Sequence, residues 1–165
     1  MRKWLIVTLI ALIPTFVSAE TTNYTTTSYI VDLKVMPSAI EAAPTMALLK
    51  RRGVKTDEGG EKALYHMECV AFMYKDHTDA TGVSLYTYDD GSTQVLKWDY
   101  TGKDENGDGL SEGKGTGNYI SGTGRFEGMK GTAEFEAQYL TPYAPDKGTL
   151  GDMFVTGVSN YTLGQ

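Results

Sequence analysis

Apolar and polar residues alternate along much of this chain with a period of two, the spacing of a β-strand that buries one face. The first clear segment runs from 24 to 35 and places four apolar side chains on one face: Tyr29, Val31, Leu33 and Val35. β-Branched and aromatic residues, including 11 Tyr, are abundant in the chain. Strands are therefore the element that the pattern predicts.

The same alternation predicts strands over 63–74, 82–88, 93–100, 132–140 and 153–163, with two short strands inside 118–126. The turn Asp89-Asp90-Gly91-Ser92 joins two of these segments and predicts a hairpin, because Asp and Gly favour tight turns. The count predicts an all-β fold, a single antiparallel β-barrel of about eight strands of the calycin-like kind. A two-sheet sandwich has the same periodicity and remains the alternative.

One stretch, 38–53, is helix-capable rather than alternating. Pro44 interrupts any single helix there, and Gly53 is placed to cap a short helical turn over 46–52. We therefore expect this stretch to be a connector between strands.

Glycine is unusually frequent between Gly113 and Gly131, in the sequence GKGTGNYISGTGRFEGMKG. Such density indicates sharp corners, bulges or a close approach of two backbones within a sheet. A phosphate-binding loop is the competing interpretation. The spacing of Gly122, Gly124 and Gly128 differs from the dinucleotide motif, however, and no P-loop Gly-Lys-Ser/Thr follows. We interpret the run as a barrel corner.

Residues 1–19 have the three parts of a secretory signal peptide: a basic start, an apolar core over 4–17 and the small-residue end Val17-Ser18-Ala19. The expected cleavage lies between Ala19 and Glu20, which leaves 20–165 as a single domain of ordinary size. The apolar core is shorter than the ~20 residues of a membrane span. We expect a secreted or periplasmic protein without stable membrane insertion after cleavage.

The chain carries 21 Asp and Glu against 15 Lys and Arg, a formal net charge of −6 at pH 7. This balance disfavours nucleic acid or an anionic lipid surface as a partner. Cys69 is the single cysteine, so an intramolecular disulfide is impossible and packing has to hold the fold. No cofactor motif is recognisable, and we expect no cofactor.

His66 and Glu68 lie two residues apart in the predicted strand 63–74, which puts them on one face together with Leu64 and Val70. A His and a carboxylate that face a cavity could act as general acid and base. The alternative is a hydrogen-bonded pair on the outer face of the sheet. Both residues are candidates for contact with a ligand.

Aromatic residues of the predicted hairpin are candidates to line a cavity for an apolar ligand, namely Tyr86 and Trp98, with Tyr88 and Tyr100 beside them. Core or outer-wall packing explains the same residues without a ligand. Cys69 has no identifiable base, and we interpret it as a small buried apolar side chain.

The loop KDENGDGLSEG opens like a calcium-binding loop, with oxygen ligands alternating over Asp104, Asn106, Asp108 and Gly109. The twelfth position is Gly115 rather than Glu, although Glu112 stands at the ninth. The flanking segments predict strands rather than the helices of such a site. We expect an acidic hairpin loop and assign no metal site.

The sequence GTGRFEGMKGTAEFEAQY resembles a G-T-G-[KR]-[FY]-x-G-[IM]-x-G signature of the allene oxide cyclase-like and dirigent-like barrel superfamily, which includes small exported bacterial proteins. Gly53-Val54, HMECVAF from His66, the Asp89-Asp90-Gly91 turn, Trp98 and Gly102 follow in the same order. The resemblance covers roughly 53–140. It implies an eight-stranded antiparallel barrel with an enclosed cavity, often oligomeric. The catalytic residues of the plant cyclases have no recognisable counterparts here.

Three functional hypotheses follow. The first is a non-catalytic module that binds a small apolar ligand inside the barrel. The second, which the resemblance suggests, is an isomerase or cyclase acting on a small lipophilic substrate, with His66 and Glu68 moving protons. The third is a surface or assembly protein that binds through the barrel exterior, with a homo-oligomer among the expected partners. A roomy apolar cavity, converging ionisable groups or a filled barrel would distinguish them.

Overall fold

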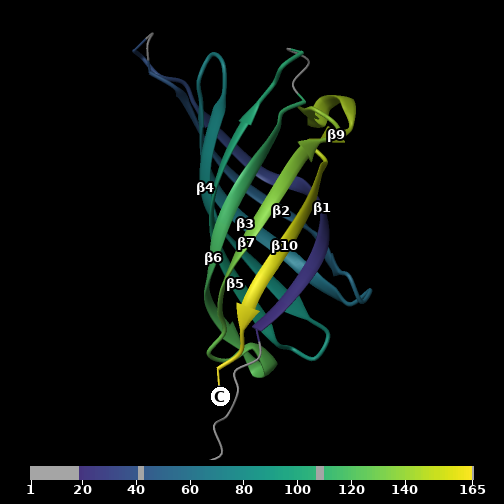
Figure 1. The fold of residues 1–165 in the computed structure, drawn as a ribbon. Coiled ribbons are helices and arrows are strands. Elements are labelled where there is room, and N and C mark those ends of the chain that lie inside the picture. Colours follow the sequence, from purple (N-terminus) through teal and green to yellow (C-terminus); the bar gives the residue numbers. More distant parts are fainter. Residues whose placement is uncertain (1–18, 41–42, 107–109, 165) are drawn as a thin grey trace, which may run out of the picture.

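Eight long strands close into an antiparallel barrel in the computed structural model, which describes residues 19–40, 43–106 and 110–164 (Figure 1). The predicted signal peptide, apart from Ala19, lies outside these residues. The barrel strands are β1 (Ala19–Met36), β2 (Thr45–Asp57), β3 (Lys62–Met73), β4 (Thr78–Tyr88), β5 (Thr93–Lys103), β6 (Glu112–Thr123), β7 (Lys130–Tyr139) and β10 (Met153–Thr162).

The strand order is an up-and-down meander, because each strand pairs with the next one in the chain until β10 closes the barrel on β1. The segment between β7 and β10 carries the short hairpin of β8 (Tyr143–Ala144) and β9 (Thr149–Leu150), joined by the 3-10 turn η2 (Pro145–Lys147). The all-β, eight-stranded barrel prediction is confirmed, and closure excludes a two-sheet sandwich. In the described part of the chain, no helix has the length and apolarity needed to cross a membrane.

The connector predicted over 38–53 is wrong, because most of it belongs to β2. Ala47, Leu49, Arg51 and Lys55 alternate inward, but two of these four side chains are charged, which hid the strand pattern. The strand β2 pairs with β1 on one side and with β3 on the other over almost its full length, and so supplies backbone hydrogen-bond partners to both strands. Tertiary pairing therefore overrides the local helical propensity of this stretch.

The face predicted for β1 is also corrected. A β-bulge at Val31 shifts the register between Ile30 and Asp32 relative to β2. Because a bulge inserts one extra residue, the inward face changes from the even to the odd positions. Ile30 and Leu33 therefore point inward, whereas Tyr29 and Val31 are exposed on the outside.

The glycine-rich run forms one long strand and a corner, rather than the two short strands expected in 118–126. The strand is β6, and the 3-10 turn η1 (Gly124–Phe126) follows it directly. Gly124 has φ of 62° and Gly128 has φ of 70°, conformations that L side chains rarely adopt. These two positions start and end the corner that we predicted from glycine density.

The corner at η1 closes one end of the barrel, shown at the bottom of Figure 1. Phe126 and Met129 are buried there and pack in the same core cluster as Tyr88 and Tyr119. The Phe126 ring lies 5.0 Å from the Tyr88 ring, centroid to centroid. This end is therefore filled with aromatic side chains.

A buried ion pair lies just inside the closed end. Lys55 Nζ is 2.7 Å from Asp57 Oδ1 and donates a hydrogen bond of 2.9 Å to the Tyr88 hydroxyl. The Tyr88 hydroxyl in turn donates to Asp57 Oδ2 at 3.0 Å. The rings of Tyr24 and Tyr86 lie 5.2 and 5.1 Å from Nζ. Burial lowers the pKa of Lys55, whereas Asp57 opposes that shift, so the charge of this cation is compensated locally.

Replacing Phe126 with Ala is expected to lower the free energy of unfolding by about 3 to 5 kcal/mol, because a buried ring is lost from a packed end and a cavity remains. Urea denaturation followed by circular dichroism measures the change.

The matched control is Ile120→Ala on β6, whose side chain is 56% exposed on the outer face. Its effect should stay within about 0.5 kcal/mol. An equal loss of unfolding free energy in the two variants would show that Phe126 at the η1 corner stabilises the barrel no more than an exposed side chain does.

Candidate functional site: a cavity at the open end of the barrel

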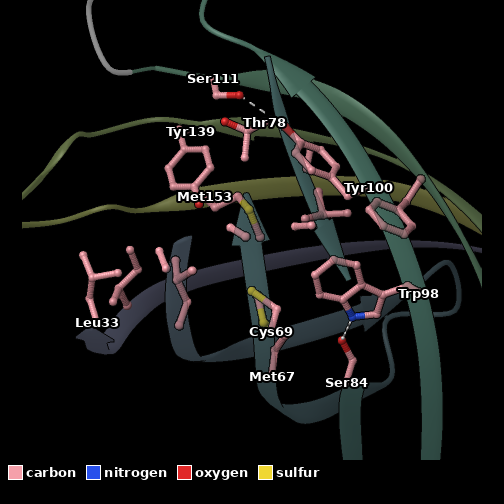
Figure 2. A pocket seen from close by; sticks show the side chains of 18 of the residues that line it. Leu33, Met67, Cys69, Thr78, Ser84, Trp98, Tyr100, Ser111, Tyr139 and Met153 are labelled. Carbon is pink, nitrogen blue, oxygen red and sulfur yellow. Dashed lines mark hydrogen bonds between the residues drawn. The ribbon is translucent and has the colours of Figure 1, made fainter. Parts of the chain in front are cut away.

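The half of the barrel opposite η1 encloses a cavity of about 350 Å³ (Figure 2). Its walls come from β1 to β5, β7 and β10, with Ser111 just before β6 and Tyr143 of the β8–β9 hairpin at the edge. The mouth therefore lies at the end of the barrel that carries β8 and β9. Most of the lining side chains are apolar.

Small side chains on three neighbouring strands create the room. Ala47 of β2 pairs directly with Ala71 of β3, and Ala71 pairs with Ala80 of β4. All three line the cavity, and Ala137 of β7 is a fourth alanine in the lining. Farther along β3 and β4 the inward positions carry tyrosines. Tyr65 and Tyr86 still line the cavity, whereas Tyr88 belongs to the closed half.

Trp98 lines the cavity, and its indole nitrogen points toward Ser84, another lining residue (Figure 2). The Nε1–H group donates a hydrogen bond of 3.0 Å to the Ser84 hydroxyl, which is buried. The ring lies over its pairing partner Gly82, where an added Cβ would be only 2.6 Å from Cζ2 of Trp98. Glycine at position 82 is therefore a condition for this placement of the indole.

The mouth of the cavity carries the polar groups. Thr78, Ser111 and Tyr139 gather at this end in Figure 2, and Asp104 lines it at the end of β5. The hydroxyls of Tyr100 and Ser111 are 3.4 Å apart. Burial is the main cause that raises the pKa of Tyr100, so its hydroxyl stays protonated at neutral pH.

Arg51 lies inside the barrel beside the cavity and has no solvent exposure. Its Nε donates to Ser28 Oγ at 3.1 Å, and Nη1 donates to the Tyr139 hydroxyl at 3.3 Å. Nη2 donates to two backbone carbonyl oxygens, those of Ser28 and Gly151. One side chain of β2 thereby connects β1, β7 and the segment that precedes β10.

Cys69 lines the cavity between Leu49 of β2 and Gly82 of β4, its pairing partners. Burial raises the pKa of its thiol to about 11, although the nearby charge of Arg51 acts in the opposite direction. The thiol is therefore protonated at neutral pH, and its chemistry fits the small apolar side chain that we expected.

The structure separates the four ligand-binding candidates into two pairs. Tyr86 and Trp98 line the cavity. His66 and Glu68 point outward from β3, because their neighbours Tyr65 and Met67 take the inward positions. Their side chains are 38% and 59% exposed, so the pair cannot act on a molecule inside the barrel.

On the outer face, Glu68 is held by a surface ion pair. Its Oε1 atom lies 3.1 Å from Lys50 Nζ and 3.5 Å from His66 Nε2. The hydrogen bond with Lys50 is the main cause that lowers the pKa of Glu68. This is the hydrogen-bonded outer pair that the sequence left as the alternative.

The remaining candidates are divided between the two ends of the barrel. Tyr100 lines the cavity, whereas Tyr88 belongs to the ion-pair cluster at the closed end. The calcium-like loop spans 104–112, and residues 107–109, including Asp108 and Gly109, lie outside the described residues. Within the described ranges, no group of three or more His, Cys, Asp or Glu side chains is arranged to hold a metal ion.

Sequence reasoning missed Arg51 and Tyr139, together with the alanines. Arg51 lies in the stretch interpreted as a connector, so its inward position was hidden with the strand itself. Tyr139 lies one residue before the end of the strand predicted over 132–140, and nothing in the sequence distinguished it. Alternation within 63–74 and 132–140 was visible, and the alanines at 71 and 137 are the small inward residues of those strands.

No protein-family model matches the chain, and no curated protein matches it in sequence. Among solved structures, a pterocarpan synthase dirigent protein is similar over 98% of this chain and 98% of its own, with 11% sequence identity and a TM-score of 0.49. The closed eight-stranded antiparallel barrel is the fold that the resemblance to the allene oxide cyclase-like and dirigent-like superfamily implies.

The partly buried position of Cys69, with its raised thiol pKa, leads to a kinetic prediction. Iodoacetamide should alkylate the folded protein on the order of a hundredfold more slowly than the urea-unfolded chain near neutral pH, because the raised thiol pKa leaves little thiolate. The rate for the folded protein should rise with pH toward about 11. Mass spectrometry of the alkylated chain follows a single site, since Cys69 is the one cysteine. Equal rates for the folded and unfolded protein would contradict the buried position.

Proposed function

We propose that this protein is a non-catalytic binding module that holds a small, mainly apolar molecule in the open half of its barrel. The observation that carries the proposal is the cavity of about 350 Å³ walled by alanine, leucine, methionine and aromatic side chains. Ligand pockets in proteins are typically concave, largely apolar and of roughly 300 to 1,000 Å³. The cavity falls at the lower end of that range, which suits a small molecule.

The chemistry of the lining favours binding over acid–base catalysis. Among the described residues that line the cavity there is no histidine, and the one carboxylate, that of Asp104, lies at the mouth. The tyrosines are held in their neutral form by burial. A cyclase mechanism through His66 and Glu68 has no support, because both side chains lie on the outer face.

An assembly role through the exterior alone would require no cavity at all, whereas the alanine row leaves the open half unfilled. The signal-like N-terminal segment supports a site of action outside the cytoplasm, in the periplasm or the extracellular space. A binding module there would carry or sequester its ligand.

The neutral fluorescent probe N-phenyl-1-naphthylamine tests the proposal, since its emission rises in apolar surroundings. We expect saturable binding with one site per chain. Replacing Ala80 with Phe should weaken binding by about tenfold or more, because the new ring occupies the space beside Ala71.

The matched control is Val83→Phe on the outer face of the same strand, where the side chain is 41% exposed. This variant adds a ring without entering the cavity and should bind the probe like the unmodified protein. Failure of the unmodified protein to bind the probe, or equal binding by both variants, would overturn the proposal.

A further inference from the structure

The buried guanidinium of Arg51 has no anionic partner within the described residues. Its hydrogen bonds end on two hydroxyls, Ser28 and Tyr139, and on two backbone carbonyls. By contrast, Lys55 in the closed half has Asp57 at 2.7 Å. A cation fully removed from water is costly unless an opposite charge lies nearby, so Arg51 stands out among the barrel's interior charges.

Tyr139 connects this cation to the cavity. Its hydroxyl oxygen accepts a hydrogen bond from Arg51 Nη1, and its ring also packs against the guanidinium at 5.0 Å from the centroid. The hydroxyl proton itself has no acceptor in the described part of the chain. Burial raises the pKa of Tyr139, so this proton stays in place at neutral pH. The side chain is half-buried and lines the cavity near its mouth.

Two polar pairs of the lining are already hydrogen-bonded. Trp98 donates to Ser84, and Tyr100 is in hydrogen-bond contact with Ser111. The Tyr139 hydroxyl is a donor beside a buried cation, and a bound molecule that accepts its proton disrupts no existing bond. An acceptor that also carries negative charge gains from the electrostatic attraction of Arg51 behind it.

We propose that the ligand is a lipophilic monocarboxylate whose carboxylate accepts a hydrogen bond from the Tyr139 hydroxyl near the mouth, while its apolar part extends between the alanine row and Trp98. The inference rests on the proposed binding function and names the ligand class of that site. Tyr139 makes the direct contact, and Arg51 is a positioning residue that orients Tyr139 and supplies the positive charge.

Decanoate and decan-1-ol test the inference as a matched pair with the same hydrocarbon chain. Each is titrated against the protein loaded with N-phenyl-1-naphthylamine, at neutral pH and below micellar concentrations. Tyr139→Phe keeps the ring and removes only the hydroxyl. We expect this variant to lose about tenfold in affinity for decanoate but less than about threefold for decan-1-ol, because a hydrogen bond to a charged acceptor is the stronger one.

Two further variants separate a specific role from a structural one. Arg51→Gln removes the charge but keeps amide donors, and it should also weaken the binding of decanoate more than that of decan-1-ol. If this variant does not fold, Tyr139→Phe alone carries the test. Tyr119→Phe is the control, because its hydroxyl bonds with Ser159 at 2.6 Å in the closed half and does not line the cavity. It should leave the affinity of both compounds unchanged.

The outcomes are distinct. A selective loss of decanoate binding in Tyr139→Phe, absent in the control, supports the inference. Probe binding with a decanoate affinity that Tyr139→Phe leaves unchanged, or with equal losses for the acid and the alcohol, overturns it while the proposed function stands. No binding of the neutral probe by the unmodified protein overturns the proposed function and this inference together.

Discussion

The interior of an eight-stranded barrel is so narrow that every inward side chain competes with those on the neighbouring strands for the same space. This protein meets the constraint by pairing large and small residues across strands. Trp98 faces Gly82, Phe135 faces Gly115, and Tyr24 faces Gly157. In each pair, a Cβ on the glycine would collide with the aromatic ring. The absent side chains therefore leave the space that these aromatic rings occupy inside the barrel.

The same constraint divides the barrel into two halves with different electrostatics. The closed half is filled, and its buried cation, Lys55, has a carboxylate and several aromatic rings around it. The open half is hollow, and its buried cation, Arg51, is surrounded by neutral groups. A folded protein usually compensates an internal charge with an opposite one. Among the described residues, Lys55 has such a partner and Arg51 does not.

Much of the fold could be predicted from the sequence, because alternation is a local signal. The hairpin of β4 and β5 and the strand β3 were correctly located, and the glycine run marked the corner at η1. Positions that depend on partners far away in the chain were not predicted. The strand β2 follows from pairing on both sides, and the inward face of β1 changes at a bulge that no residue type announces. His66 and Glu68 show the same limit, since period two places them together without telling which face is inside.

The alanine row gives the cavity two unlike walls. One wall, formed by β2, β3 and β4, offers the methyl groups of Ala47, Ala71 and Ala80. The wall from β5 and β7 offers the rings of Tyr100, Phe135 and Tyr139. A planar molecule held as we propose would meet methyl groups on one face and aromatic side chains on the other. Two unlike walls would give the proposed binding a basis for distinguishing the two faces of a flat ligand.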